Sequence, residues 1–328
     1  MTKLNIYGRI YIKYRIIHLK YTNVSGVSMC IIPNFLAEAN TICEIKENYP
    51  LSNLSTFKIG GNAELCAFPK SHTELVSLLT IAKKCSVKAR VFGNASNVLF
   101  SSHGVSGLVI FTTEMKDIAL EGEYISADCG AKLSALCNAA AKNSLCGLEF
   151  AYGIPGTVGG AVYMNAGAHG GEIFHILVES ICLDTGSGTL ITLSAEEHGF
   201  AYRKSVFQEG KLIVLSSRFK LCTGNRDSIG SRMKELSEKR RASQPLDLPN
   251  AGSIFKRPAV GFSGKYIEDA GLKGFTVGGA QVSVKHAGFI VNIGGATSDD
   301  VLTLIQKIKD EVVQKFSVSL ETEIIYID

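Results

Sequence analysis

Apolar residues recur along this chain with two periods, one near 3.6 residues and one of two residues, so helices and strands should alternate. Helical spacing is clear over residues 72–85, where positions such as Leu75 and Leu78 fall on one face. Ser71 precedes this segment and Glu74 follows three residues later, a pattern that predicts a capping box at the start of the helix.

Three further segments show helical spacing. An amphipathic helix is predicted over residues 132–144, and a charged one over residues 227–244, which ends before Pro245. The third is predicted over residues 298–316, with Ser298 as its N-cap and acidic residues in its first turn.

Short apolar segments bounded by glycine and polar residues predict strands. They lie within residues 49–61, 63–71, 88–93, 107–113, 124–130, 176–184, 188–194, 211–221 and 317–328. Residues 94–102, rich in small polar side chains, are predicted to form a loop. In the last strand, alternation places Glu321 and Glu323 on the same face.

The order of these elements predicts an α+β protein of several units. We expect a lead-in over residues 1–44, α+β units over 45–113 and 114–222, and a third, α/β unit over 223–328. Two interpretations of residues 1–28 stay open: a basic arm or strand, or an upstream translation that precedes a true start at Met29.

Composition and charge are those of a globular protein without a membrane span or a nucleic-acid surface. Hydrophobic residues make up 46% and charged residues 20% of the chain. Of the net charge of +4, residues 1–28 supply five positive charges, which leaves −1 for the other 300 residues. Nine scattered cysteines, without a metal-binding cluster, predict reduced thiols, a cytoplasmic location and no metal site.

Two loops rich in glycine and asparagine are candidates for binding a phosphate-containing ligand. The stretch 148–172 holds seven glycines in 25 residues but matches neither a dinucleotide fingerprint nor a P-loop. Gly93 to Asn97 form a second such loop after a predicted strand. Main-chain N–H groups in loops of this kind can hold a diphosphate, so together the two could bind an extended dinucleotide.

Three side chains are candidates for chemistry, each with a structural alternative. Arg203 lies in the segment YRKSVF, where a surface salt bridge and a functional role are equally plausible. Ser253 follows Gly252 and could be a turn serine, and Glu323 could face outward from an edge strand. An arginine, a serine and an acid without a histidine suit the stabilisation and protonation of an enolate.

Seven motifs follow one another over residues 45–328: STFKIGG, VFGNASNVLF, YGIPGTVGGAVYMNAGAHGGEI, YRKSVF, PNAGSIFKRP, GGAQVSVKHAGFIVN and LETEI. In this order they resemble the family of UDP-N-acetylenolpyruvoylglucosamine reductases, the MurB family. The short C-terminal unit resembles the second type within the family. The resemblance implies two FAD-binding subdomains of the PCMH (vanillyl-alcohol-oxidase-like) fold and then a substrate-binding domain.

The resemblance also implies an activity. NADPH would reduce non-covalently bound FAD, and flavin N5 would then pass hydride to C3 of the enolpyruvyl ether of UDP-N-acetylglucosamine. The product would be UDP-N-acetylmuramate, a peptidoglycan precursor used in cell wall biogenesis. By motif position, Ser253 would give the proton to C2, Arg203 would steady the carboxylate or enolate, and Glu323, rather than Glu321, would be the catalytic glutamate.

The resemblance assigns further residues to binding. FAD contacts carry over to Gly93, Asn94, Ala95, Ser96, Asn97, Gly153, Ile154, Pro155, Gly156, Thr157, Gly159 and Gly160. Substrate contacts carry over to Tyr202, Lys256, Arg257 and His286. Arg257 stands where many members have asparagine, and an arginine suits a diphosphate.

Two other functions compete with this one. A carbohydrate oxidase of the same fold is one, but many of these tether flavin through a histidine in the first loop, and GNASN has none. A non-catalytic flavin- or nucleotide-binding protein is the other, which the presence of all three catalytic candidates disfavours. We expect the chain to act as a monomer on small molecules.

Overall fold

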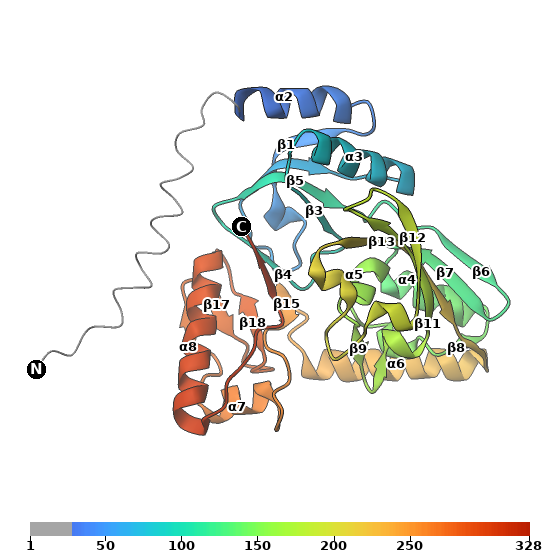
Figure 1. The fold of residues 1–328 in the computed structure, drawn as a ribbon. Coiled ribbons are helices and arrows are strands. Elements are labelled where there is room, and N and C mark those ends of the chain that lie inside the picture. The colour runs from blue at the N-terminus through green and yellow to red at the C-terminus, as the bar shows by residue number, and fades with distance from the viewer. Residues whose placement is uncertain (1–27) are drawn as a thin grey trace, which may run out of the picture.

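The structure is a computed structural model that describes residues 28–328, and three β-sheets of four or five strands dominate it (Figure 1). Both interpretations of residues 1–28 depend on a segment of which residues 1–27 lie outside the described part. Within that part, no helix combines the length and the apolar character needed to cross a bilayer.

The first sheet is mixed and has the strand order β1-β2-β5-β3. Its strands are β1 (Ile45–Pro50), β2 (Asn62–Ala67), β3 (Ala89–Phe92) and β5 (Val105–Phe111). Strand β5 is parallel to both β2 and β3, whereas β1 is antiparallel to β2. Helix α3 (His72–Lys84) joins β2 to β3, and α2 (Ser28–Ala39) lies over α3 (Figure 1). The loop after β3 therefore leaves the carboxyl edge of the sheet, where α/β proteins often bind ligands.

The second sheet is antiparallel, with the strand order β12-β11-β13-β7-β6. Its strands are β6 (Ile118–Glu121), β7 (Tyr124–Asp128), β11 (Leu177–Asp184), β12 (Leu190–Ser194) and β13 (Leu212–Lys220). The helices α4 (Leu133–Lys142) and α5 (Val158–Tyr163) lie between β7 and β11 in the chain. The glycine-rich stretch therefore belongs to the connection that holds α5, which packs against β13.

The third sheet is also antiparallel, with the order β15-β18-β17-β16. Its strands are β15 (Asn250–Ser253), β16 (Thr276–Val277), β17 (Ala280–Val282) and β18 (Phe289–Asn292), with helices α7 (Ser263–Asp269) and α8 (Ser298–Phe316). The long helix α6 (Arg226–Ser243) precedes this sheet but runs along the second unit (Figure 1). Its residues Ile229 and Met233 join the core there, although the sequence predicts a boundary at residue 223.

Short strand pairs and single helical turns complete the architecture. The pairs are β4 (Val98–Phe100) with β19 (Ile325–Ile327), β8 (Leu145–Cys146) with β14 (Cys222–Thr223), and β9 (Gly167–Ala168) with β10 (Gly171–Glu172). The 3-10 turns are η1 (Leu51–Asn53), η2 (Glu149–Ala151), η3 (Ile173–His175), η4 (Glu196–His198) and η5 (Val206–Glu209). Strand β4 corrects the prediction of a loop over residues 94–102, because β19 supplies a parallel partner from the far end of the described chain.

The first two sheets share one hydrophobic core. Residues such as Leu65 and Leu78 from the first unit and Leu136 and Phe219 from the second are completely buried in a single cluster. The third unit has its own core around α8, to which Phe57 and Leu99 of the first unit contribute. Burial of this contiguous apolar surface fixes the units relative to one another.

The helix caps agree with the predictions only in part. The Ser71 hydroxyl accepts from the Glu74 N–H of α3, but the Glu74 carboxylate accepts from Lys70 N–H instead of closing a capping box. At α8 the N-cap is Thr297, not Ser298 as predicted, because Thr297 and Asp300 close a capping box between them. Ser298 is buried and bonds reciprocally with Ser102 of the first unit.

Candidate active site

Residues from all three units line one cavity of about 1720 Å³. This exceeds the range of roughly 300–1,000 Å³ that is usual for a single ligand, so the cavity has room for a cofactor and a substrate. The loops after β3 and before α5 form one part of its wall, and segments around β15, α7 and β18 form another.

The loop after β3 carries the first predicted set of cofactor contacts. All five of its residues, Gly93 to Asn97, line the cavity. Ala95 has a φ of 45°, in the left-handed region, so the loop turns sharply. The main-chain N–H groups of residues 93–97 donate to no acceptor within residues 28–328. Unpaired N–H groups in a turn suit an anionic ligand such as a diphosphate.

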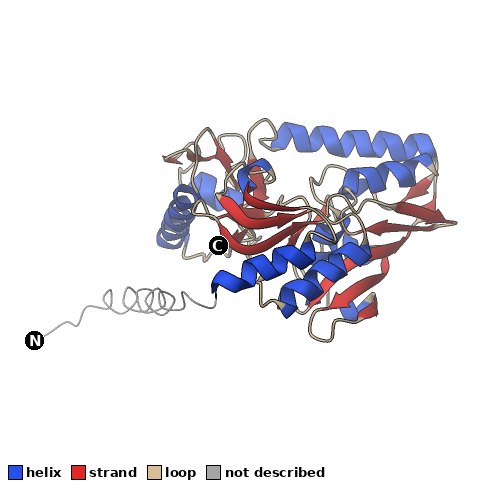
Figure 2. Ribbon diagram, turned by 90° about the horizontal axis from the view of Figure 1, so that it is seen from above, coloured by secondary structure: helices blue, strands red, loops and turns tan. Residues whose placement is uncertain are grey.

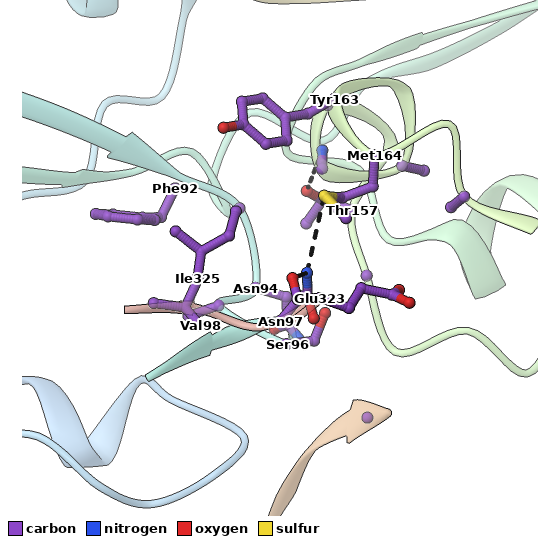
Figure 3. A pocket seen from close by; sticks show the side chains of 18 of the residues that line it. Phe92, Asn94, Ser96, Asn97, Val98, Thr157, Tyr163, Met164, Glu323 and Ile325 are labelled. Carbon is purple, nitrogen blue, oxygen red and sulfur yellow. Dashed lines mark hydrogen bonds between the residues drawn. The ribbon is translucent and has the colours of Figure 1, made fainter. Parts of the chain in front are cut away.

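The glycine-rich loop before α5 packs directly against this first loop. The Asn94 side chain donates to the Pro155 carbonyl oxygen at 2.6 Å. A Cβ atom on Gly93 would lie 1.9 Å from Thr157 Oγ1, so only glycine permits the contact. Figure 3 shows Asn94, Ser96 and Thr157 around the same space.

The glycine-rich loop differs from the prediction in two respects. Gly159 and Gly160 do line the cavity, but their N–H groups already donate to Cys129 O and Thr157 Oγ1, at 2.8 and 3.5 Å. Gly153 does not line the cavity, whereas Ile154, Pro155, Gly156 and Thr157 do. Free main-chain donors therefore come mainly from the loop after β3. The glycines of the loop before α5 mainly allow the backbone to pack closely against its neighbours.

Arg203 and Glu323 form a largely buried ion pair in the cavity wall. Arg203 Nε donates to Glu323 Oε1 at 2.9 Å, and the two side chains are 18% and 14% exposed. Arg203 Nη2 also donates to Gly167 O at 3.1 Å. Burial raises the pKa of the Glu323 carboxyl, and Arg203 and then Lys256 oppose this rise. The structure thus places Arg203 in an internal pair rather than a surface one.

Glu323 is held where the first unit meets the third. Its main-chain oxygen accepts from Asn97 Nδ2 at 3.0 Å, and its N–H donates to Ile254 O at 2.8 Å. Asn97 also approaches Met164 Sδ at 3.8 Å (Figure 3). Glu321 and Glu323 flank Thr322, which forms an isolated antiparallel bridge with Phe255, and regular β structure begins at Ile325. The shared face of the two acids stays a prediction.

Ser253 also lines the cavity. Ser253 ends β15, is half-buried, and its hydroxyl donates to Phe255 O at 3.2 Å. Gly252 before it has a φ of 77°, a value that favours glycine. The three predicted catalytic residues, from three separate segments, therefore line one cavity.

Of the four predicted substrate contacts, three line the cavity and one does not. Tyr202, Arg257 and His286 line the cavity, and the Tyr202 hydroxyl accepts from Arg257 N–H at 3.2 Å. Burial is the main cause that lowers the pKa of His286. Lys256 does not line the cavity, and its ammonium group pairs with Glu321 at 2.6 Å.

Sequence reasoning missed two polar side chains in the cavity wall, Arg240 and Gln244 of the α6 region. The Arg240 Nε and Gln244 Oε1 atoms are buried without a hydrogen-bond partner in the described chain. Gly153 explains how Arg240 fits, because a Cβ atom there would lie 2.9 Å from Arg240 Cδ. Arg240 and Gln244 are four residues apart, a spacing that places two side chains on the same face of a helix. The other charged residues of α6 make this pair hard to single out from the sequence.

These features fit the predicted FAD. The buried Arg240 Nε lacks a hydrogen-bond partner within the described chain, and the main-chain N–H groups of residues 93–97 are also free to donate, so both suit an anionic ligand. The diphosphate of a dinucleotide supplies that charge, and the cavity is large enough for the rest of the cofactor. Residues 93–97, the loop before α5 and Arg240 are therefore the groups that would hold it.

Comparisons with known proteins agree with this geometry. Residues 63–194 match the family model of an FAD binding domain, and residues 244–327 match the C-terminal domain of UDP-N-acetylenolpyruvoylglucosamine reductase. The chain is 48% identical over 291 residues to the UDP-N-acetylenolpyruvoylglucosamine reductase of Latilactobacillus sakei, covering 89% of this chain and 96% of that protein. For the enzyme of the same name from Caldicellulosiruptor bescii, identity is 46%, with 88% and 92% covered.

A solved structure shows the same fold. The crystal structure of UDP-N-acetylenolpyruvylglucosamine reductase (MurB) from Thermus caldophilus matches with a TM-score of 0.74 and 34% identity, covering 87% of this chain and 98% of that one. Fold and cofactor domain together define an FAD-dependent oxidoreductase that acts on a small molecule. The chain belongs to the family of UDP-N-acetylenolpyruvoylglucosamine reductases. The predicted fold class, enzyme class and cofactor are thereby confirmed.

Proposed function

We propose that this chain uses NADPH to reduce the enolpyruvyl ether of UDP-N-acetylglucosamine to UDP-N-acetylmuramate, a precursor of peptidoglycan. The observation that carries the proposal is that the Arg203–Glu323 pair and Ser253 line the same cavity as the two cofactor loops. Reduction of an alkene conjugated to a carboxylate needs such groups, because negative charge develops on the carboxylate and a proton must reach carbon.

FAD, when bound, would supply the redox chemistry, the transfer of hydride from NADPH to C3 of the enolpyruvyl group. The residues of the chain handle the charge and the proton. Arg203 uses two of its roughly five guanidinium donors within the protein, which leaves others for the substrate carboxylate. Its fixed position lets it stabilise the enolate as charge develops.

Ser253 is the proposed proton donor to C2. A serine hydroxyl is a weak acid, so its proton must be replaced from another group. Glu323 is proposed to hold a proton at this end of the cavity and to orient Arg203, since burial raises the pKa of its carboxyl. Tyr202, Arg257 and His286 are proposed to contact the sugar nucleotide.

We also propose that the chain works as a cytoplasmic monomer. All three proposed catalytic residues and both cofactor loops come from one chain, so a partner subunit is not needed to complete the cavity. The eight described cysteines are free thiols, in keeping with a reducing compartment. Burial raises the pKa of Cys66, Cys129, Cys137 and Cys182 to about 12, which keeps them protonated.

An anaerobic absorbance experiment tests the activity. The purified protein should be yellow, should bleach with NADPH, and should recover its colour when UDP-N-acetylglucosamine enolpyruvate is added. Recovery only in air would mean a flavoprotein with another substrate. UDP-N-acetylglucosamine without the enolpyruvyl group is the matched control and should leave the flavin reduced.

A further inference from the structure

Phe262 is a large aromatic side chain that lines the cavity but remains exposed. Its side chain lies just before α7 and is 60% exposed, although apolar rings of this size are usually covered. The two cofactor loops come from the other units, so Phe262 belongs to the wall that the third unit supplies.

The ring of Phe262 makes a cation–π contact with Arg257. The Arg257 guanidinium lies 4.2 Å from the ring centroid, and its Nε donates to Gly261 O at 3.3 Å. A cation–π contact of this kind fixes one face of the ring. Because most of the ring is still exposed, the other face is available to a planar ligand group.

Phe262 also lies at the end of a chain of contacts that begins at the reacting groups. The Arg203 guanidinium lies 5.0 Å from the Tyr202 ring, and the Tyr202 hydroxyl accepts from Arg257 N–H at 3.2 Å. Arg257 in turn contacts Phe262. The proposed substrate has a matching layout, because its enolpyruvyl group and its uracil base are at opposite ends, separated by a sugar and a diphosphate.

We propose that Phe262 stacks on the uracil base of the UDP-sugar substrate and sets the affinity for its nucleotide end. This inference rests on the proposed function, because it takes the substrate from there. Arg257 positions the ring, and Lys265, which also lines the cavity, adds positive charge beside it for the diphosphate. The Lys265 pair with Asp269 is exposed, so the ammonium group can exchange that partner for a phosphate.

Binding of UDP to the oxidised holoenzyme, measured by calorimetry, tests the inference. Phe262→Ala should weaken UDP binding, and raise the KM for UDP-N-acetylglucosamine enolpyruvate, by roughly five- to a hundredfold, the usual effect of removing a stacked aromatic ring. Phe262→Trp should bind UDP as well as the wild type, whereas Phe262→Leu should resemble the alanine variant. Phe275→Ala is the matched control, because Phe275 is 39% exposed in the same unit but does not line the cavity.

The outcomes separate this inference from the proposed function. If the wild type binds FAD but does not turn over the enolpyruvyl substrate, the proposed function fails. If the wild type turns over the enolpyruvyl substrate and Phe262→Ala binds UDP normally, only the stacking inference is overturned. Equal losses in Phe262→Ala and Phe275→Ala, or full affinity in Phe262→Leu, would also overturn it. Thermal unfolding of each variant confirms that the protein is folded.

Discussion

Ser253 offers the sharpest test at the scale of single residues, because its proposed role belongs to one half-reaction only. Ser253→Ala should leave flavin reduction by NADPH unchanged and slow reoxidation by the enolpyruvyl substrate by about a hundredfold or more. Anaerobic stopped-flow absorbance measures the two steps separately. Equal loss in both steps would make Ser253 a structural residue.

Glu321 and Glu323 form a matched pair for a second prediction. Glu323→Gln should slow reoxidation by about a hundredfold, since an amide can neither supply a proton nor take up the negative charge that pairs with Arg203. Glu321→Gln should stay within about twofold of the wild type, because its pair with Lys256 is exposed. Steady-state rates of the two variants give the comparison, and equal losses would contradict the assignment.

The pH dependence of reoxidation provides a further check on Glu323. Burial raises the pKa of its carboxyl, so the protonated form persists to higher pH than in an exposed glutamate. If that form is the active one, the wild-type rate should fall as the pH rises through the raised pKa. The residual rate of Glu323→Gln should lack this fall.

At the residue scale, the sequence predicts site residues only through motifs, and their chemical roles stay predictions. Ser253, Arg203 and Glu323 were all assigned by motif position, and the structure brings them to one cavity. Their environments could not be predicted, because the burial of Glu323 depends on Arg203, 120 residues away. A local pattern cannot report such a contact.

At the scale of elements, helix α6 carries the prediction about the cofactor. Arg240→Leu should lower the affinity for FAD by about tenfold or more, because a buried cation that meets a diphosphate is lost. Arg241→Leu, on the exposed side of the same helix, should bind FAD normally. Fluorescence titration of the apoprotein with FAD measures both, and equal affinities would contradict the role of Arg240.

A histidine contact between α3 and β7 links the first two units. His72 Nε2 lies 2.9 Å from Asp128 Oδ1, and this hydrogen bond is the main cause that raises the pKa of His72. The stabilisation is therefore complete below the unfolded pKa of about 6.5 and is lost as the pH rises through the higher folded value.

This linkage predicts a pH-dependent difference between the wild type and His72→Gln. Denaturant unfolding should find the wild type more stable by no more than about 1 kcal/mol at low pH, since the pair is partly exposed. The difference should shrink above the raised pKa of His72. A difference that stays constant from acid to alkaline pH would mean that the charge of His72 contributes nothing.

Elements with a strong local pattern could be predicted, and elements held by distant partners could not. Helices α3 and α8 lie where the apolar spacing places them. Strand β4 was missed because it has only three residues and its partner, β19, follows more than 220 residues later. The cap of α8 was misplaced by one residue because Ser298 bonds to Ser102 instead.

At the scale of the whole molecule, the cofactor should stabilise all three units together. The cavity has walls from each unit, so FAD binds the folded state and not the unfolded chain. Removing FAD should lower the unfolding free energy by about 2.7 kcal/mol relative to the protein at a hundredfold excess over Kd. Calorimetry of the apoprotein and holoprotein measures this, and identical melting temperatures would contradict it.

The general arrangement could be predicted from the sequence, but the sharing of cores could not. The order of elements indicated α+β units, and the motif resemblance indicated the flavin fold that the Thermus caldophilus structure confirms. The common core of the first two sheets and the packing of α6 on the second unit arise from long-range burial. Apolar periodicity reports which face is buried, but not which neighbour covers it.

The pairing of β19 with β4 has a consequence for how the enzyme is made. Ile325 N–H donates to Asn97 O and Ser101 N–H donates to Ile327 O, so the segment that carries Glu323 is fastened to a loop made early in synthesis. Both cofactor loops precede β19 in the chain, so they can form before the segment with Glu323, the proposed catalytic glutamate, joins them. The cavity is therefore completed only when β19 pairs with β4.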